Sequence, residues 1–467
     1  MHSKNFKKQI LEFNKFLKSN KNNINLIALS FLHILRPQYD LIKNFNNFDL
    51  KYRILYHLKF TLNKIFENLF TRSQKKKNLP RDVDVLIVSN LININNLNKN
   101  DDFYFGNLQQ DLIKNGINCH YLFRNFTRHG VNRIRKKSKI NVHHYLDDFD
   151  TLKCEIKYFF IAIGEFLKFK FNISNTNKIK KYKKLFSIFN FLTGISSLRF
   201  SNLIINFIKK NPPKIILITL EGHSWERVLS YKLKKKFSNL IVIGYQFSVI
   251  SKNTNSLFLK LGNNFETDFI FTKNKINKKL FVKKGFNPNK IKVLGNLKKS
   301  NIKMIKNKKL NNIIICPEAL NYENEVMFEF AKKCAKEIKD FNFIFRQHPN
   351  YDKEFISEYK NLLISRKSLH NDLLNSKILI YRGSSVCFEA ATYKILPLYL
   401  KIKNEISIDP LYKFQKKEFK ILTVKDLKKI IYNNSSINKK INMLTKKNLQ
   451  FNLKQDTSIF KKILNDK

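Results

Sequence analysis

The chain has 467 residues, and its 89 Lys and Arg against 35 Asp and Glu give a formal charge of +54 at pH 7. This length corresponds to two or three domains, and a hydrophobic content of 43% excludes an intrinsically disordered chain. The 11 Gly and 9 Pro exclude collagen-like and low-complexity sequences. Only 13 of the basic residues are Arg, the residue preferred for bidentate phosphate contacts, so no nucleic-acid partner is expected. A field of this sign still attracts anionic membranes and anionic substrates.

The cysteines and apolar segments indicate the cellular compartment. The five cysteines are scattered and never form a C-x-x-C pair, which argues against a zinc site or a disulfide framework and favours a reducing compartment. Residues 1–11 lack the pattern of a secretory signal, and no segment reaches the roughly 18–20 apolar residues of a membrane-spanning helix. We therefore expect a cytoplasmic protein, soluble or peripheral on the inner face of the plasma membrane.

The first part of the chain is predicted to be helical and then to enter an α/β domain. Residues 1–80 form an N-terminal helical region, and a Rossmann-like domain follows at 81–300. The domain opens with a buried strand at 84–89, a helix at 106–116 and a second strand at 117–123.

Within this domain, residues 154–210 are predicted to form a helical insertion in which Phe and Lys interleave. Two interpretations remain open. The segment is an ordinary pair of amphipathic helices packed on the domain, or it is an interfacial patch that rests on anionic lipid.

The rest of the chain repeats the alternation of strands and helices. Further strands of the first domain are predicted at 214–220, 240–245, 269–272 and 290–294, and helices at 225–236 and 275–284. A second Rossmann-like domain is expected at 301–430, with a C-terminal helical tail at 431–467. Its predicted strands lie at 313–317, 342–345, 378–381 and 395–399, and its helices at 325–339, 352–361 and 386–393. The pattern predicts an α/β fold with two Rossmann-like domains that face each other across a cleft.

The first candidate site is the segment around Glu221, at the carboxyl end of a predicted strand, where open α/β sheets bind ligands. Gly222 allows a tight turn there, and either Glu221 or His223 is suited to take a proton from an attacking hydroxyl. The alternative is that Glu221 only caps the following helix.

The second and third candidates follow strands of the second domain. Pro349 restricts His348 to an extended conformation, from which the imidazole, beside Arg346, is suited to contact a phosphate. The turn formed by Gly383, Ser384 and Ser385 offers hydroxyls and backbone N–H groups to an anion, or serves only as a helix cap.

Four weaker candidates complete the set. Glu389 lies four residues after Ser385 and is a candidate acceptor for ribose hydroxyls. Glu318 ends the first strand of the second domain and is a candidate contact to the donor base or sugar. Asp102 and Tyr104 occupy the corresponding place in the first domain and are candidate acceptor contacts.

Taken together, these motifs resemble those of bacterial GT-B glycosyltransferases of surface and capsular polysaccharide synthesis. The nearest groups are the CMP-sugar-using sialyltransferase, polysialyltransferase and Kdo-transferase families, and the resemblance covers residues 81–430. It implies that Glu221 with Gly222 supplies the catalytic acid/base, that the His348-Pro349 motif binds the CMP phosphate, and that the Ser384–Ser385 pair helps to hold it. In the sialyltransferases two acids usually precede the Gly, whereas here Leu220 precedes Glu221.

The sequence thus predicts a glycosyltransferase that moves a sugar from a nucleotide donor, CMP-activated, to a polysaccharide or glycolipid acceptor at the cell surface. No metal and no cofactor are expected. The alternative with the same fold is a CDP-polyol phosphotransferase of the teichoic-acid-polymerase kind, which also has an HP motif. The alternative from another class is a nucleic-acid-binding protein built on the charge.

Overall fold

The computed structural model describes most of both predicted Rossmann-like domains. The described residues are 78–92, 102–125, 144–145, 156–157, 160–161, 163–164, 167, 188–252, 254–297, 311–318, 320–348, 351, 354–403, 405–412, 419–433, 441–442 and 455–466. The predicted N-terminal helical region therefore lies outside the described residues apart from its last three positions.

Among the described residues, seven parallel strands form the sheet of the first domain, in the order β3-β2-β1-β4-β5-β6-β7. The central strands at 85–91, 215–219 and 241–246 are short, largely apolar and buried runs, as expected where helices cover both faces of a parallel sheet. The order is that of the Rossmann fold with one added edge strand. The strands are β1 (Val85–Leu91), β2 (Cys119–Asn125), β3 (His144–Tyr145), β4 (Ile215–Thr219), β5 (Ile241–Gln246), β6 (Phe269–Thr272) and β7 (Ile291–Val293).

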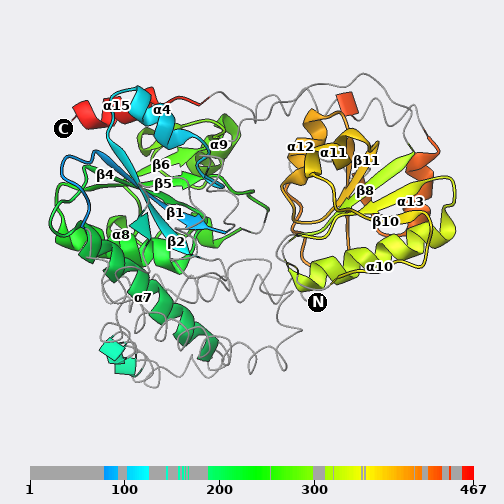
Figure 1. Cartoon of the computed structure of the whole chain (residues 1–467), viewed down its shortest axis with the longest axis horizontal. Coiled ribbons are helices and arrows are strands. Elements are labelled where there is room, and N and C mark those ends of the chain that lie inside the picture. The colour runs from blue at the N-terminus through cyan, green and yellow to red at the C-terminus, as the bar shows by residue number, and fades with distance from the viewer. Residues whose placement is uncertain are drawn as a thin grey trace.

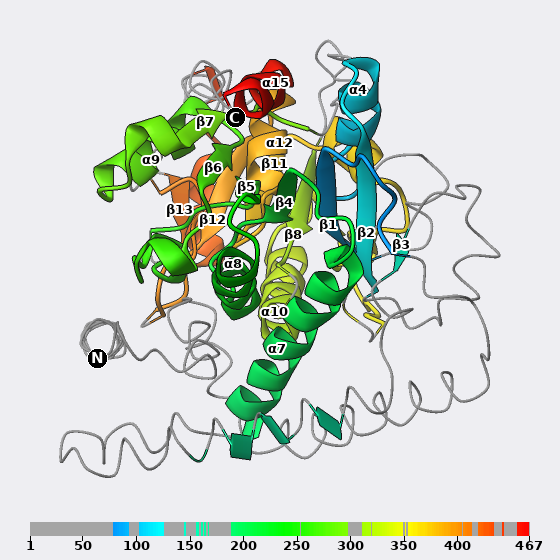
Figure 2. The ribbon, with the colours of Figure 1, turned by 90° about the vertical axis from the view of Figure 1, so that its left-hand side faces the viewer.

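Helices cover the two faces of this sheet (Figure 2). The helices α7 (Ile188–Ile208) and α8 (Ser224–Lys236) pack on one face, and α4 (Leu108–Lys114) packs on the other together with the C-terminal helix α15 (Ser458–Asn465). The remaining helical elements are α9 (Lys275–Lys283), η7 (Ser256–Phe258), η8 (Asn263–Phe265) and η9 (Pro288–Lys290).

The helix α7 decides part of the question left open for residues 154–210. Its residues Phe200, Leu203, Ile204 and Phe207 are buried against α8 and the sheet. This half of the insertion is therefore an ordinary core helix. The described positions between 156 and 167 are also helical, and they expose the apolar side chains Ile156, Phe160 and Leu167.

In the described part of the second domain, six parallel strands form the sheet, in the order β10-β9-β8-β11-β12-β13. The order is again that of a Rossmann fold. The strands are β8 (Asn312–Cys316), β9 (Asn342–Phe345), β10 (Leu362–Ile364), β11 (Ile378–Tyr381), β12 (Leu396–Leu400) and β13 (Lys420–Ile421). The helices are α10 (Asn321–Glu337), α11 (Leu369–Leu374), α12 (Val386–Thr392) and α13 (Val424–Ile431).

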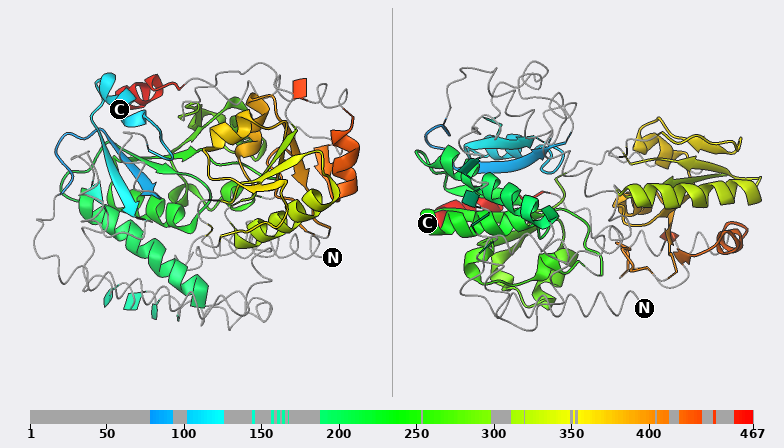
Figure 3. Two further views of the ribbon diagram at one scale, coloured as in Figure 1. Left: turned by 45° about the vertical axis from the view of Figure 1, so that its right-hand side comes forward. Right: turned by 90° about the horizontal axis from the view of Figure 1, so that it is seen from below.

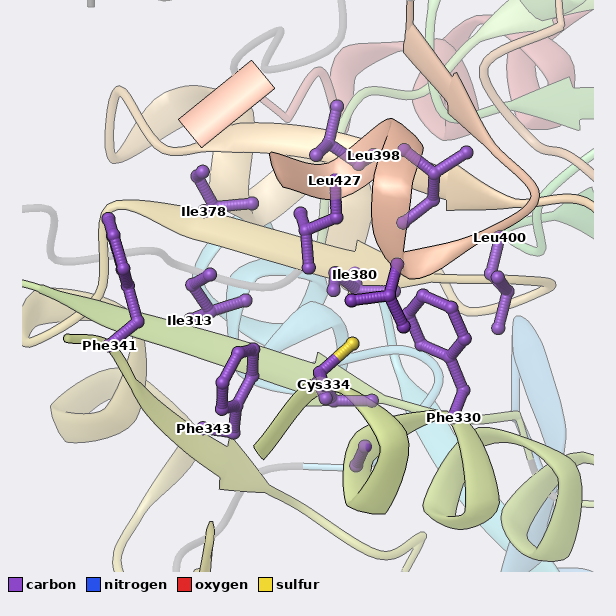
Figure 4. Packing of buried hydrophobic residues seen from close by; sticks show 14 of the residues in the cluster. Ile313, Phe330, Cys334, Phe341, Phe343, Ile378, Ile380, Leu398, Leu400 and Leu427 are labelled. Atoms are coloured by element: carbon purple, nitrogen blue, oxygen red, sulfur yellow. The ribbon is translucent and has the colours of Figure 1, made fainter. Parts of the chain in front are cut away.

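The main core of the second domain lies between this sheet and the helices α10 and α13. Figure 4 shows Phe330 and Cys334 of α10 and Leu427 of α13 pointing toward Ile380 and Leu398 of the central strands. Buried apolar surface of this kind is the main favourable contribution to folding, at about 25 cal/mol per Å². Side chains of α11 and α12 fill a smaller core on the opposite face.

The two sheets form separate lobes, and the chain returns to the first lobe at its C-terminus (Figures 1 and 3). The backbone N–H of Asp456 donates to the Leu294 carbonyl at 2.8 Å, and the ring of Phe460 packs edge-on against Phe271 at 5.2 Å. The prediction of an α/β fold with two Rossmann-like domains is confirmed. That the domains face each other across a cleft stays a prediction.

The prediction of a helix at 352–361 is wrong for the described residues 354–361, which form no helix. The strand β10 that follows was not predicted. Side-chain bonds to the backbone, one local and one to a distant segment, replace the helical pattern here. The hydroxyl of Ser357 accepts from the Tyr359 N–H at 3.1 Å, and the Asn361 amide donates to the Ile338 carbonyl at 2.8 Å.

None of the described helices combines the length and hydropathy that crossing a bilayer requires. The four described cysteines, Cys119, Cys316, Cys334 and Cys387, are buried thiols, and Cys154 lies outside the described residues.

Candidate functional site

Each sheet has one topological switch point, where the chain stops adding strands on one side and continues on the other. In the first sheet it lies between β1 and β4, and in the second between β8 and β11. Ligands of open α/β sheets bind outside the carboxyl ends of the strands at such points. The connections that follow these four strands carry the predicted residues Asp102, Tyr104, Glu221, His223, Glu318, Gly383, Ser384 and Ser385.

Glu221 and His223 form a hydrogen-bonded pair in the loop between β4 and α8. The Nε2 atom of His223 lies 3.0 Å from Oε2 of Glu221, and both side chains are about one third exposed, at 35% and 27%. The buried carboxylate of Glu226 accepts the backbone N–H groups of Glu221, Gly222 and His223 at 2.8–3.0 Å. Glu226 therefore takes part in capping α8 and fixes the loop.

The loop can adopt this shape only because residue 222 is glycine. Gly222 has φ +82°, in the left-handed region, and a Cβ atom there would lie 2.5 Å from the backbone N of Leu257. The buried guanidinium of Arg227 holds the opposing segment in place, because it donates to the Leu259 carbonyl at 3.0 Å. Close backbone packing between this loop and η7 thus positions Glu221 and His223.

Asp102 organises the connection that follows β1. Its carboxylate accepts the Ser89 hydroxyl at 2.8 Å and the backbone N–H groups of Tyr104 and Phe105 at 2.9 and 2.7 Å. These bonds give Asp102 a structural role in placing Tyr104. Its predicted contact to an acceptor stays a prediction.

Tyr104 follows β1, and the catalytic candidate Glu221 follows β4, the strand that pairs with β1. Burial raises the pKa of the Tyr104 phenol, the charge of Glu221 raises it further, and a hydrogen bond with the Asn90 side chain acts in the opposite direction. The Tyr104 ring packs edge-on against Phe247 at 4.7 Å and against Phe103 at 5.0 Å. The structure therefore brings the predicted acceptor contact Tyr104 and the predicted catalytic residue Glu221 together at one edge of the first sheet.

The second switch point brings Glu318 and Gly383 into contact. A Cβ atom on Gly383 would lie 2.0 Å from Oε2 of Glu318, so the missing side chain leaves room for this carboxylate. The buried amide of Asn324 on α10 joins this loop to the next one. It donates to the Glu318 carbonyl at 2.9 Å and accepts the His348 N–H at 3.0 Å. Asn324 was not predicted from the sequence.

His348 follows β9, which pairs with β8, the strand that precedes Glu318. Burial lowers the pKa of His348, which favours the neutral imidazole with its single N–H donor. Arg346, which precedes it, forms an ion pair with the buried Asp372 at 2.8 Å, and this ties the end of β9 to α11. Pro349 lies outside the described residues.

Ser384 and Ser385 lie on the other side of Glu318, at the start of α12. The Ser384 hydroxyl accepts the Val386 N–H at 3.4 Å, and the Ser385 side chain is exposed. Glu389 is also exposed, one turn further along the helix. The contacts predicted for these three residues with a nucleotide stay predictions.

A buried ionic cluster next to this site was not predicted from the sequence. The fully buried Arg382 donates from Nε to Glu323 at 2.5 Å and from Nη2 to Glu405 at 2.6 Å, and Tyr322 also hydrogen-bonds Glu405. Burial lowers the pKa of Arg382, but the two carboxylates outweigh it and raise that pKa above its ordinary value.

Burial also raises the pKa of Glu323, from 4.5 to about 7. Its Oε1 atom has no hydrogen-bond partner within the described part of the chain. No local pattern identifies such a cluster, because Glu323 and Arg382 are 59 positions apart. Within the described ranges, no group of three or more His, Cys, Asp or Glu side chains is placed to hold a metal ion.

No family model matches the chain, and no curated protein matches it. Among solved structures, UDP-GlcNAc 2-epimerase from Neisseria meningitidis bound to UDP-GlcNAc is 14% identical with a TM-score of 0.48, over 82% of this chain and 98% of that one. The calicheamicin glycosyltransferase CalG4 is 8% identical with a TM-score of 0.48, over 83% and 98%. The kitacinnamycin glycotransferase is 7% identical with a TM-score of 0.49, over 83% and 99%. Likenesses this distant say nothing about the reaction of this chain, and the assignment of two Rossmann-like domains depends on the strand orders.

Proposed function

We propose that the chain is a glycosyltransferase that moves a sugar from a CMP-activated donor to a hydroxyl of a surface polysaccharide or glycolipid. The observation that carries the proposal is the Glu221–His223 pair, which lies at the switch point of the first sheet with a 3.0 Å contact between the two side chains. A carboxylate and an imidazole in hydrogen-bond contact, both partly open to solvent, are suited to general base catalysis.

In this mechanism Glu221 takes the proton of the acceptor hydroxyl, with His223 hydrogen-bonded to the carboxylate throughout. The acceptor oxygen then attacks the anomeric carbon as the bond to the leaving phosphate breaks, through a transition state with oxocarbenium character as in glycoside hydrolysis. The negative charge that develops on the phosphate needs hydrogen-bond donors that are already in place.

The second domain supplies such donors at its own switch point. His348 and the pair Ser384–Ser385 follow β9 and β11, the two neighbours of β8 in the sheet. Their loops therefore flank the loop of Glu318. A neutral imidazole and two hydroxyls donate to phosphate oxygens, while a carboxylate accepts hydrogen bonds from sugar hydroxyls or from an exocyclic amine of a base.

Binding of nucleotides tests the donor class directly. We expect CMP to raise the melting temperature of the full chain more than UDP does, because ligands that bind only the folded state stabilise it. Incubation with CMP-sugars and with labelled CDP-glycerol, followed by product analysis, then separates a glycosyltransferase from a CDP-polyol phosphotransferase. Transfer of a phosphoryl-polyol unit would replace the proposed reaction by the alternative one.

We also propose that the enzyme works on the inner face of the plasma membrane. Supporting this, Ile156, Phe160 and Leu167 expose 50%, 66% and 45% of their side chains at helical positions, in a chain of charge +54. Apolar side chains in a strongly basic chain suit an anionic bilayer surface.

Vesicles provide the test. The full chain should bind vesicles that contain phosphatidylserine and bind less as salt rises, and Phe160→Ser should weaken this binding. Equal binding to neutral phosphatidylcholine vesicles, or equal binding by the variant, would contradict the proposal.

A further inference from the structure

Arg124 brings a cationic group to the edge of the first sheet that carries Glu221. It stands near the end of β2, in register with Asn90 of β1, and it is half-buried. Its positive charge lowers the pKa of Tyr104, while Glu221 acts on the same phenol in the opposite direction. Strand β1 lies between β2 and β4, so Arg124 near the end of β2 and Glu221 after the end of β4 lie at the same edge of the sheet, two strands apart.

The contacts of Arg124 orient its guanidinium. The Cζ atom lies 3.3 Å from the ring centre of Phe200 on α7, and Nη2 donates to the Ser196 hydroxyl at 3.4 Å. Stacking engages the flat face of a guanidinium, whereas carboxylates and phosphates are bound through its N–H edge. An arginine held against a ring in this way is preorganised for a planar, bidentate contact with an anion.

The other charged groups that act on Tyr104 are carboxylates. Glu221 and Asp102 are both acidic, so an anionic acceptor that approached Glu221 would meet like charges. An acceptor with only hydroxyls would need no cation at this position.

We propose that Arg124 binds an anionic group of the acceptor, the carboxylate of an acidic sugar or the phosphate of a glycolipid, and so selects acidic acceptors. This inference rests on the proposed function, in which the first domain holds the acceptor beside Glu221. It adds a substrate class and a specificity-determining residue that the sequence analysis did not identify.

The chain contains a built-in reporter for this site. Its only Trp, Trp225, has its ring centre 6.1 Å from that of Phe200, the ring on which Arg124 stacks. Tryptophan fluorescence of the full chain at fixed ionic strength therefore follows binding at Arg124. The probes are matched pairs that differ in one anionic group: methyl glucuronide with methyl glucoside, and glycerol 3-phosphate with glycerol.

The variants are Arg124→Gln, Arg124→Lys and a charge-matched control, Lys214→Gln. Lys214 is exposed, pairs with Asp84 at 2.8 Å and precedes β4, at the opposite edge of the sheet. We expect saturable binding of one anionic probe to the wild type and to Lys214→Gln, and binding about tenfold weaker or more in Arg124→Gln, since hydrogen bonds to charged groups contribute this much. Arg124→Lys, which keeps the charge without the planar fork, should fall between them. The responding pair identifies the carboxylate or the phosphate as the ligand.

Equal affinity in the wild type and Arg124→Gln, an equal loss in Lys214→Gln, or no saturable response to either anion would overturn the proposal. Nucleotide binding, followed by the melting temperature, is measured on the same variants and should not change. If the anion site behaves as expected while no nucleotide binds, the proposed glycosyl transfer fails and the Arg124 site stands. If nucleotides bind and the anions do not, the reverse holds.

Discussion

The buried Glu323–Arg382 pair predicts how the stability of the second domain depends on pH. In the unfolded chain the pKa of Glu323 returns to about 4.5, whereas in the folded domain burial raises it to about 7. Between these values the folded domain keeps a proton that the unfolded chain has released. The stability contributed by protonated Glu323 is therefore complete below about pH 4.5 and is lost as pH rises toward 7.

The size of this effect follows from the two pKa values. A difference of one in pKa corresponds to 1.36 kcal/mol, so the span from 4.5 to about 7 corresponds to a loss of about 3 kcal/mol. Glu323 is fully buried, so solvent does not screen the effect. In Glu323→Gln this dependence is absent, because the amide does not titrate and its oxygen still accepts from Arg382.

The assay compares hydrogen exchange of peptides from β8 and β11 in the wild type and Glu323→Gln at each pH, which cancels the titration of all other groups. The stability advantage of the wild type over the variant should fall by about 3 kcal/mol between pH 4 and 8. The matched control is Glu337→Gln on the same helix, where an exposed carboxylate pairs with Lys428 at 3.2 Å. A constant difference between wild type and Glu323→Gln, or a difference that grows with pH, would refute the reasoning.

Three further predictions concern the candidate site. Glu221→Gln should lower turnover about 100-fold or more without changing CMP affinity, since general acid–base catalysis contributes on this scale, and near-normal turnover would remove Glu221 from the mechanism. His348→Ala and Ser385→Ala should each weaken CMP binding about tenfold, and their effects in the double variant should be non-additive, whereas the binding of cytidine should change little. Calorimetry that finds equal losses of affinity for CMP and cytidine would contradict a phosphate contact. Measured by chemical denaturation, Gly222→Ala should lower the stability of the first domain by at least about 2 kcal/mol more than Gly116→Ala. Both glycines have a positive φ, but a Cβ at residue 222 would clash with Leu257, whereas a Cβ at residue 116 would meet no atom within 4 Å. Equal effects of the two substitutions would show that the contact with Leu257 is easily relaxed.

The sequence alone predicts the two Rossmann-like domains because their signals are local. Apolar runs such as residues 215–219 and 313–316 have the texture of strands buried on both faces, and polar or glycine-containing loops mark their carboxyl ends. The position of Glu221 after β4 follows from this pattern, as does that of Ser384 after β11.

Contacts between distant segments could not be predicted in this way. Asn324 joins the Glu318 and His348 loops through an amide on α10, and Arg382 meets Glu323 across 59 positions. Nothing in the neighbouring sequence distinguishes any of these side chains from an ordinary polar residue. Only the pairing of β8 with both β9 and β11 brings them together.

The two glycines of the candidate site also show that a local sequence pattern does not reveal contacts with distant segments. At Gly222 the local interpretation, a tight turn that needs glycine, agrees with the structure, which shows a positive φ and a backbone neighbour at 2.5 Å. At Gly383 the sequence suggested room for an anion, but the atom that a Cβ would meet is the carboxylate oxygen of Glu318. A phosphate bound by Ser384 and Ser385 would be repelled by that carboxylate if it lay over Gly383. The phosphate is therefore expected outside the strand ends, away from the Glu318 carboxylate and between the loops of His348 and the serines, with the hydroxyl-rich or amine-bearing part of the nucleotide next to the carboxylate.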